Sequence, residues 1–393
     1  PKLLWAEVES TGGVSKKALI GAEEIAGLEF TDEERELMLS GLEELREDYE
    51  RLREVAIDNS VSPALHFEPV LPGMELPSAP PARRASRPKL KERPADDSEL
   101  AFLPVTELGN LLRVGALSSE ELTTLYLERL KRFDPELHCV ITLTEERAMR
   151  QARRADRDLA SGVWRGPLHG VPWGAKDLLA VRGYPTTWGA APFRDQVIDE
   201  DAEVVRRLDE AGAVLVAKLT LGALAWGDVW YGEKTRNPWN TEQGSSGSSA
   251  GPGSATAAGL VGFSIGSETW GSIVSPSTRC GVSGLRPTFG RVSRAGAMAL
   301  SWSMDKLGPM CRSVEDCALV FEAIHGSDNL DPTAVDQPFV WDSDLDFRSL
   351  RVGYLKSAFE RELEFDDEDT EEDKVRARDW HALDLRTLKI LES

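Results

Sequence analysis

The stretch from Gln243 to Arg291 constrains the fold of this chain more than any other part of the sequence. It is rich in glycine and serine and contains no lysine, a composition that flexible linkers share. Apolar runs at 257–265 and 273–274 interrupt it, however, and a solvated linker would not carry them. The stretch is therefore predicted to be buried, with backbone N–H groups and hydroxyls placed to hold an oxyanion beside a nucleophile.

The overall composition argues against two classes of function. The formal net charge of −21 at pH 7 argues against nucleic-acid binding through the phosphate backbone, since no basic patch offsets it. The sequence also lacks a run of about 20 apolar residues, so no helix is expected to span a membrane. At 393 residues the chain is long enough for one large domain or two ordinary ones.

The four cysteines are not spaced like metal ligands; they are Cys139, Cys280, Cys311 and Cys317. We expect them to be buried free thiols, which are compatible with a reducing compartment, and a cytoplasmic location is favoured. Export stays open, because the sequence starts with Pro1 and a leader would be invisible. Neither a metal site nor an organic cofactor is expected.

The N-terminal part of the chain is predicted to be helical and then extended. Thr31 and Glu34 form a capping-box pattern, and apolar residues between 38 and 55 draw one stripe on a helix. Such a helix could lie along another surface or belong to a simple helical hairpin. The proline-rich stretch at 69–94 is predicted to be an extended tether.

From Leu100 onward, helical patterns alternate with short buried strands, which is typical of an α/β protein with a mostly parallel sheet. Helices are expected at 118–133, 144–159, 202–211 and 314–326, and strands within 167–180, at 214–217 and at 351–355. The acidic run at 362–373 is predicted to be a surface loop.

The predicted organisation has three parts: a helical segment at 1–68, a tether at 69–99 and an α/β domain at 100–393. Residues 384–391 look like the middle or end of a helix rather than a natural stop. We therefore expect the α/β domain to be incomplete at its C-terminus.

Lys176 stands out as a candidate base. It lies in the motif GAKD at 174–177, at the end of an apolar predicted strand. Burial lowers the pKa of a lysine toward the range in which it can act as a base, and a serine nucleophile needs such a base. A surface lysine beside Asp177 would give the same local sequence, so both interpretations stay open at this point.

Three motifs make the chain resemble the amidase signature family: GAKD at 174–177, SGSSAG at 246–251 and GSETWGSI at 266–273. A further match at 280–293 extends the resemblance over residues 100–326. The resemblance implies a mixed, mostly parallel sheet covered by helices. It also implies the hydrolysis of a small-molecule carboxylic amide through an acyl-enzyme.

The resemblance assigns Lys176 as the base, Ser248 as a bridging serine and Ser272 as the nucleophile. Two serine pairs, at 245–246 and 248–249, both fit the serine pair of the family's Gly/Ser-rich motif. In the family the bridging serine stands 24 residues before the nucleophile, and Ser248 stands 24 residues before Ser272. The bridging serine is expected to follow a cis peptide bond.

The resemblance also predicts an oxyanion hole, formed by the backbone N–H groups of Thr269, Trp270, Gly271 and Ser272. Ser249, Trp270 and Val274 are expected to contact the substrate. Trp270 replaces the usual glycine and could form a substrate wall. Val274 stands where the tRNA-dependent amidotransferase has, in its A subunit, an arginine that is thought to hold the glutamine carboxylate. An amide without an α-carboxylate is therefore favoured.

Two alternatives remain open. The residues at 247–251 fit the G-x-S-x-G elbow around Ser249, with His325 or His381 as base, although the preceding 237–244 looks like a turn rather than a strand. The second alternative is a non-catalytic or glutamine-dependent amidotransferase-like subunit that acts in a complex. Residues 23–63 resemble the small C subunit of that amidotransferase, and a homodimer is also possible.

Overall fold

The computed structural model describes residues 13–56, 70, 73–74, 85–360, 362–366 and 370–392. The chain divides into two compact units, Pro1–Phe67 and Glu68–Ser393. Part of the predicted tether at 69–94 and the end of the segment at 23–63 lie outside the described residues. The predicted three-part organisation therefore stays a prediction.

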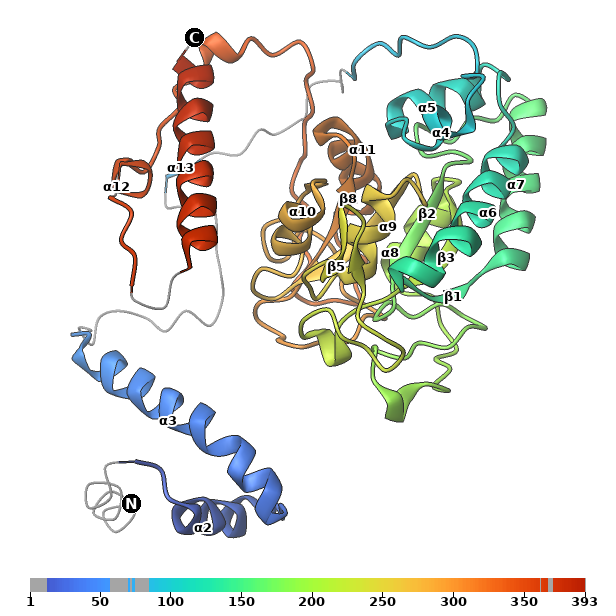
Figure 1. Cartoon of the computed structure of the whole chain (residues 1–393). Coiled ribbons are helices and arrows are strands. Elements are labelled where there is room, and N and C mark those ends of the chain that lie inside the picture. Colours follow the sequence, from blue (N-terminus) through green and yellow to red (C-terminus); the bar gives the residue numbers. More distant parts are fainter. Residues whose placement is uncertain are drawn as a thin grey trace. The chain divides into compact units, whose positions relative to one another are not determined.

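The described part of the first unit is a helical hairpin of α2 (Lys16–Ala26) and α3 (Asp32–Glu54) (Figure 1). Thr31 caps α3 in the predicted capping box, which confirms the helix start. An ion pair of 2.8 Å between Arg35 and Glu23 joins the two helices. Within the described residues, α3 buries none of its side chains.

A six-stranded mixed sheet forms the centre of the second unit (Figure 1). In spatial order its strands are β1 (Val140–Leu143), β3 (Val214–Leu219), β2 (Pro172–Lys176), β6 (Phe263–Glu268), β8 (Lys306–Cys311) and β7 (Ser283–Gly284). The central strands β3, β2 and β6 are parallel to one another, whereas β1 and β8 run antiparallel to them. The predicted mixed, mostly parallel sheet is confirmed.

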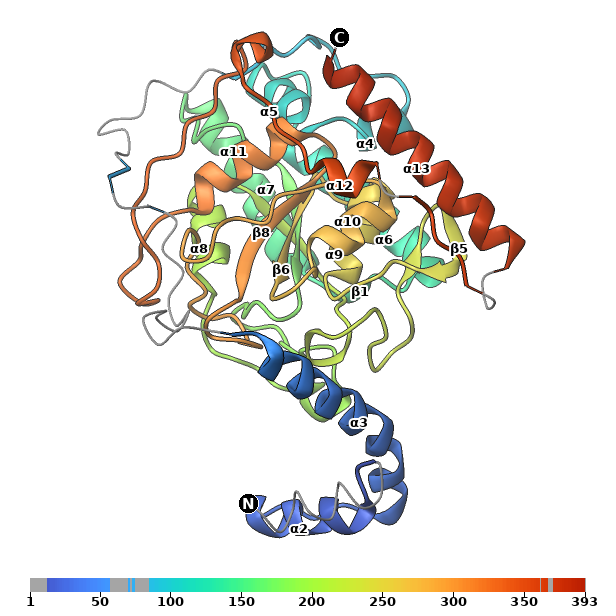
Figure 2. The same ribbon diagram turned by 90° about the vertical axis from the view of Figure 1, so that its left-hand side faces the viewer.

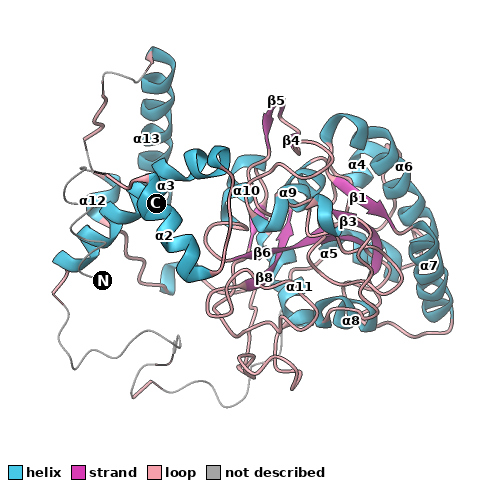
Figure 3. Cartoon of the chain, turned by 90° about the horizontal axis from the view of Figure 1, so that it is seen from below, coloured by secondary structure: helices cyan, strands magenta, loops and turns pink. Residues whose placement is uncertain are grey.

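Helices pack on both faces of this sheet and form two hydrophobic clusters. The helices are α4 (Asp97–Ala101), α5 (Val105–Arg113), α6 (Ser119–Leu137), α7 (Glu145–Ala160), α8 (Glu203–Glu210), α9 (Ala250–Ala257), α10 (Val274–Cys280) and α11 (Val314–Ile324). One cluster joins Trp173 and Phe263 to α5, α8 and α11, and the other joins Val214 and Val216 to α6, α7 and α9. Figure 3 shows α9 and α11 on opposite sides of β6 and β8.

The Gly/Ser-rich stretch forms buried structure rather than a linker, as predicted. It contains α9, β6 and α10, and α9 and α10 lie side by side (Figure 2). A Cβ atom on Gly251 of α9 would lie 2.4 Å from the backbone nitrogen of Thr220, so only glycine fits there. This close packing brings the loops at 245–249 and 269–273 to the end of β2.

The strand predicted at 351–355 is wrong. These residues have no regular secondary structure, and no strand pairs with them among the described residues. Their apolar side chains Val352, Tyr354 and Leu355 are exposed, so neither burial nor backbone pairing would stabilise a strand. A short helix, α12 (Lys356–Phe359), follows directly.

The acidic loop predicted at 362–373 is shorter than expected. The hydroxyl of Thr370 accepts a hydrogen bond of 3.1 Å from the N–H of Asp373, which starts α13 (Glu371–Glu392). The helical pattern predicted at 384–391 lies inside α13 and is confirmed. In the part of the chain that the structure describes, no helix is both long and apolar enough to cross a membrane.

Candidate active site

The candidate site lies where the parallel strands β2 and β6 end side by side. Ala175 of β2 pairs with Ile265 of β6, and Lys176 is the last residue of β2. Because parallel strands end at the same edge of a sheet, Lys176 lies next to Ser267 and Glu268 at the end of β6. Polar side chains from two strands therefore converge at one edge.

Lys176 is fully buried among serine side chains. Its Nζ atom donates hydrogen bonds to the hydroxyls of Ser248 at 2.8 Å, Ser267 at 2.8 Å and Ser249 at 3.1 Å. These hydroxyls can also donate to a neutral amine, so the site accommodates the lysine without a proton. Of the two interpretations of Lys176, the buried one is therefore observed and the surface one is wrong.

Burial lowers the pKa of Lys176 from its ordinary value to about 7. The carboxylates of Asp305 and Glu268 oppose this shift, because nearby negative charge favours the protonated amine. A large share of Lys176 is consequently neutral near pH 7, which is the form that a general base needs.

The serine pair at 248–249 connects Lys176 to the start of α9. The Gly247–Ser248 peptide bond is cis, as the resemblance predicts for the bridging serine. Ser249 is fully buried, donates to the backbone oxygen of Ser267 at 3.0 Å and accepts from the N–H of Ser267 at 3.1 Å. The Ser249 hydroxyl thus faces Lys176 and β6, and its predicted contact with substrate stays a prediction.

Ser272 is half-buried in the loop between β6 and α10. Its carbonyl oxygen accepts a hydrogen bond of 3.1 Å from the N–H of Ser249, which fixes the loop beside the serine pair. Within the described part of the chain, the Ser272 hydroxyl itself makes no hydrogen bond. The structure therefore brings Lys176 and Ser248 into contact but shows no hydrogen bond between Ser248 and Ser272.

Glu268 shapes the predicted oxyanion loop. Its carboxylate accepts the N–H groups of Ile273 at 2.8 Å and Val274 at 3.0 Å. Burial acts to raise the pKa of Glu268, but hydrogen bonds from the backbone of Val274, Ile273 and Gly271 outweigh it and lower the pKa. The Glu268 carboxylate thus holds the backbone that follows Ser272.

Two residues that were predicted to contact the substrate, Trp270 and Val274, are exposed to solvent. The Trp270 side chain is 83% exposed. Among the described residues, the N–H groups of Trp270 and Ser272 have no hydrogen-bond acceptor. Both N–H groups are thereby available to a ligand.

Three features of the site were missed by sequence reasoning. Ser267 is a third serine partner of Lys176, and Asp305 accepts a hydrogen bond from the Thr269 hydroxyl. Asp177 pairs with Lys218 rather than Lys176, through an ion pair of 2.6 Å in which both side chains are fully buried. Only the position of Lys218 near the end of the strand at 214–219 could have indicated this pair.

The elbow alternative around Ser249 is not supported by the geometry. Residues Asn240–Gly244 do form a strand, β5, which corrects the predicted turn, but among the described residues β5 pairs only with the short β4 (Arg236–Asn237). The hydroxyl of Ser249 contacts Lys176 and Ser267 rather than a histidine. His325 stacks on Phe321 at the end of α11.

The four cysteines are buried free thiols, as predicted. Within the described residues, no group of three or more histidine, cysteine, aspartate or glutamate side chains is placed to hold a metal ion.

Comparison with known proteins places these motifs in context. A model of the amidase family matches residues 121–376. The A subunit of the glutamyl-tRNA(Gln) amidotransferase of Moorella thermoacetica is 45% identical over 243 residues, which cover 61% of this chain and 50% of the relative. A putative amidase, AmiD, of Mycobacterium bovis is 41% identical over 276 residues, which cover 70% of this chain and 58% of the relative.

Solved structures give the same picture. The peptide amidase of Stenotrophomonas maltophilia is 38% identical with a TM-score of 0.57, and the match covers 60% of this chain and 50% of that one. The A subunit of the glutamyl-tRNA(Gln) amidotransferase of Thermotoga maritima is 31% identical with a TM-score of 0.53, covering 63% and 51% of the two chains. The chain spans about half the length of the curated relatives it matches.

Proposed function

This chain belongs to the amidase family, and from that membership we propose that it hydrolyses a carboxylic amide through an acyl-enzyme on Ser272. The observation that supports the proposal best is the buried Lys176, whose Nζ lies 2.8 Å from the hydroxyl of Ser248. A lysine with a pKa of about 7 can accept a proton from serine at neutral pH.

In the proposed mechanism, neutral Lys176 takes the proton of the Ser248 hydroxyl while Ser248 takes the proton of Ser272. The Ser272 oxygen then attacks the amide carbonyl and forms a tetrahedral intermediate. When that intermediate collapses, the C–N bond breaks and the proton returns through Ser248 to the leaving amine. In deacylation, water gives a proton to the same relay and attacks the acyl carbon. The ester bond to Ser272 then breaks, the proton returns to the Ser272 oxygen and the carboxylic acid is released.

The oxyanion of the intermediate needs hydrogen-bond donors, and the proposed donors are the backbone N–H groups of residues 269–272. Those of Trp270 and Ser272 fit best, because they have no acceptor within the described chain. Losing one such donor costs about 3–4 kcal/mol of transition-state stabilisation in a serine hydrolase. Val274 has no positive charge that could hold an α-carboxylate. We therefore propose a substrate amide that lacks an α-carboxylate.

The alternative function is a non-catalytic or glutamine-dependent subunit of a complex. It is favoured by the 45% identity to the A subunit of an amidotransferase. It is also favoured by the helical hairpin of the first unit, which we propose acts as the small C subunit of that amidotransferase does. In that proposal residues 1–68 are the hairpin segment, 69–99 the tether and 100–393 the amidase domain.

Covalent labelling tests the proposed nucleophile. We expect a fluorophosphonate to modify Ser272, because a serine activated by a base attacks phosphorus as it attacks a carbonyl. Peptide mass mapping identifies the modified residue. Ser272→Ala should abolish labelling, whereas the matched control Ser275→Ala, an exposed serine in the first turn of α10, should retain it. An adduct on Ser249, or labelling that survives Ser272→Ala, would overturn the assignment.

The pKa of Lys176 gives a pH prediction. The neutral amine is the active form, so kcat/KM should be low below pH 7, rise with pH through about 7 and then level off. Asp305 raises the pKa of Lys176, so Asp305→Asn should move the midpoint to lower pH. Asp199→Asn, which removes an exposed carboxylate, is the control and should leave the midpoint in place. A pH-independent rate between 5 and 9 would contradict the role of Lys176.

A further inference from the structure

A cavity of about 370 Å³ lies next to the Lys176 site. Its walls come from β6, from the segment that precedes β8 and from the loop after α11. The apolar part of the lining includes Met298, Ala299, Trp302, Leu307 and Leu330. Most of the side chains in the lining are apolar.

Two lining residues belong to the site already described. Ser267 is in the cavity wall and also lies 2.8 Å from Nζ of Lys176. Asp305 accepts the hydroxyl of Thr269, in the predicted oxyanion loop, and the N–H groups of Leu300 and Ser301 at 2.7 and 3.0 Å. The cavity therefore shares Ser267 with the surroundings of Lys176 and Asp305 with the predicted oxyanion loop.

The charged groups in the wall are paired with the protein itself. Arg294 forms an ion pair of 2.9 Å with Asp331, and it also donates to the Trp302 carbonyl at 2.7 Å and to the Thr333 hydroxyl at 2.9 Å. Burial acts to raise the pKa of Asp331, but Arg294 and Thr333 outweigh it and hold this pKa well below its usual range. The positive charge of Arg294 is thus balanced by the carboxylate of Asp331, so Arg294 offers little attraction to a substrate carboxylate.

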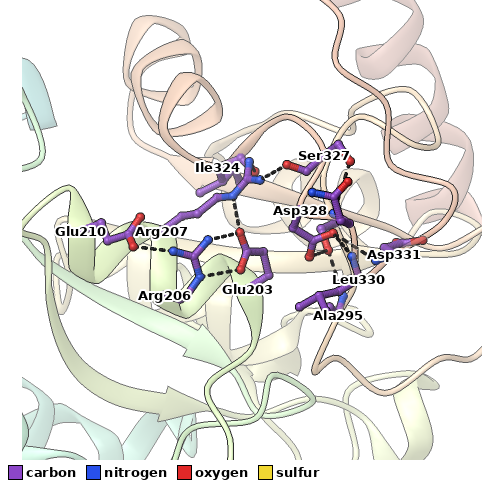
Figure 4. Close-up of polar contacts among 12 residues, drawn as sticks. Glu203, Arg206, Arg207, Glu210, Ala295, Ile324, Ser327, Asp328, Leu330 and Asp331 are labelled. Atoms are coloured by element: carbon purple, nitrogen blue, oxygen red, sulfur yellow. Dashed lines mark hydrogen bonds and ion pairs between the residues drawn. The ribbon is translucent and has the colours of Figure 1, made fainter.

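A polar network holds the loop after α11, which contributes Leu330 and Asp331 to the cavity lining (Figure 4). Asp328 accepts the N–H groups of Leu330 at 2.9 Å and Asp331 at 3.0 Å. Arg207 of α8 pairs with Glu203 at 2.6 Å and donates to the Ser327 carbonyl at 2.7 Å. The loop after α11 is therefore fixed to α8 and by its own hydrogen bonds.

We propose, as an extension of the proposed function, that this cavity binds a neutral apolar substituent of the substrate amide, such as a branched aliphatic chain or one aromatic ring. The apolar lining favours such a group, because each methylene removed from water tightens binding about four-fold. The volume lies at the lower end of the range of small-molecule pockets and exceeds the roughly 150 Å³ that holds one benzene, so a single ring fits in it.

Binding to the Ser272→Ala protein tests this inference without turnover. Phenylacetamide, acetamide and succinamic acid, which carries a carboxylate, are titrated by ligand-observed NMR. We expect phenylacetamide to bind at least about 10-fold more tightly than acetamide, which corresponds to two or more buried methylenes. Succinamic acid should bind no more tightly than acetamide. Equal affinities, or the tightest binding by succinamic acid, would overturn the proposal.

Matched variants locate the binding site. Ala299→Phe places a ring at the exposed wall of the cavity and should reduce the preference for phenylacetamide to less than about 2-fold. Ala160→Phe makes the same change at the exposed end of α7 and should keep the preference. Trp302→Ala, at an exposed position of the wall, should also weaken phenylacetamide binding. An unchanged preference in both cavity variants would contradict the assignment.

Fluorophosphonate labelling separates this inference from the proposed function on which it rests. If Ser272 is labelled and the preference for phenylacetamide is absent, only the cavity assignment fails. If phenylacetamide binds as expected and Ser272 is not labelled, the cavity assignment holds and the proposed catalysis fails.

Discussion

Replacing Ser272 by alanine is expected to reduce amide hydrolysis by about 10⁴-fold or more, because no other hydroxyl is placed to form the acyl-enzyme in the proposed mechanism. Lys176→Ala should cause a loss of the same order, since Ser248 then has no base 2.8 Å away. The residues of such a relay act as a unit, so the double variant should be little worse than either single one. Rates are measured with a chromogenic apolar amide.

Ser249→Ala is the matched control for these variants. Ser249 is fully buried beside Lys176; its hydroxyl accepts a hydrogen bond of 3.1 Å from Nζ of Lys176 and bonds to the backbone of Ser267, but it transfers no proton in the proposed mechanism. Its loss leaves the Ser267 N–H unpaired and should cost about 1–3 kcal/mol of stability with a milder loss of turnover. An active Ser272→Ala protein together with an inactive Ser249→Ala protein would assign the nucleophile to Ser249.

Lys218→Met is expected to lower the free energy of unfolding by about 3–5 kcal/mol, because it leaves the fully buried carboxylate of Asp177 without its cation. Burial raises the pKa of Asp177 and lowers the pKa of Lys218, and the ion pair opposes both shifts. Lys218 also donates to the Pro185 carbonyl at 2.9 Å and to the Thr186 hydroxyl at 2.7 Å. Urea unfolding at pH 7 measures the loss.

Lys131→Met is the control for this change. Lys131 pairs with Glu145 at the same distance of 2.6 Å, but both side chains are about half exposed. An exposed ion pair contributes only about 0–1 kcal/mol, because water screens it. If the two variants lost equal free energy of unfolding, burial would not explain the contribution of the Asp177–Lys218 pair to stability.

The predictions from sequence succeeded where local pattern dictates structure. The capping box at Thr31 starts α3, since the cap and the third helical residue form hydrogen bonds with each other's backbone within one turn. The predictions failed at 351–355, because a strand needs a partner that the local sequence does not reveal. The loop predicted at 362–373 is too long, because the Thr370 hydroxyl accepts the N–H of Asp373 and α13 begins at Glu371.

For the candidate site, too, some features follow from the sequence and others from the tertiary structure. The sequence by itself determined which residues carry the proposed chemistry, because the spacing of Lys176, Ser248 and Ser272 in three specific motifs identifies the family. It also determined that the Gly/Ser-rich stretch is buried, because the apolar runs within it have no stable place in water.

Only the tertiary structure decided which groups surround those residues. Whether Lys176 is buried and whether Asp177 pairs with Lys176 or Lys218 depend on strands that are distant in sequence and adjacent in the sheet. The same holds for Ser267 and Asp305, whose positions follow from β6 and β8 lying side by side. The pKa of a lysine is fixed by the solvent and charges around it, and long-range packing supplies both.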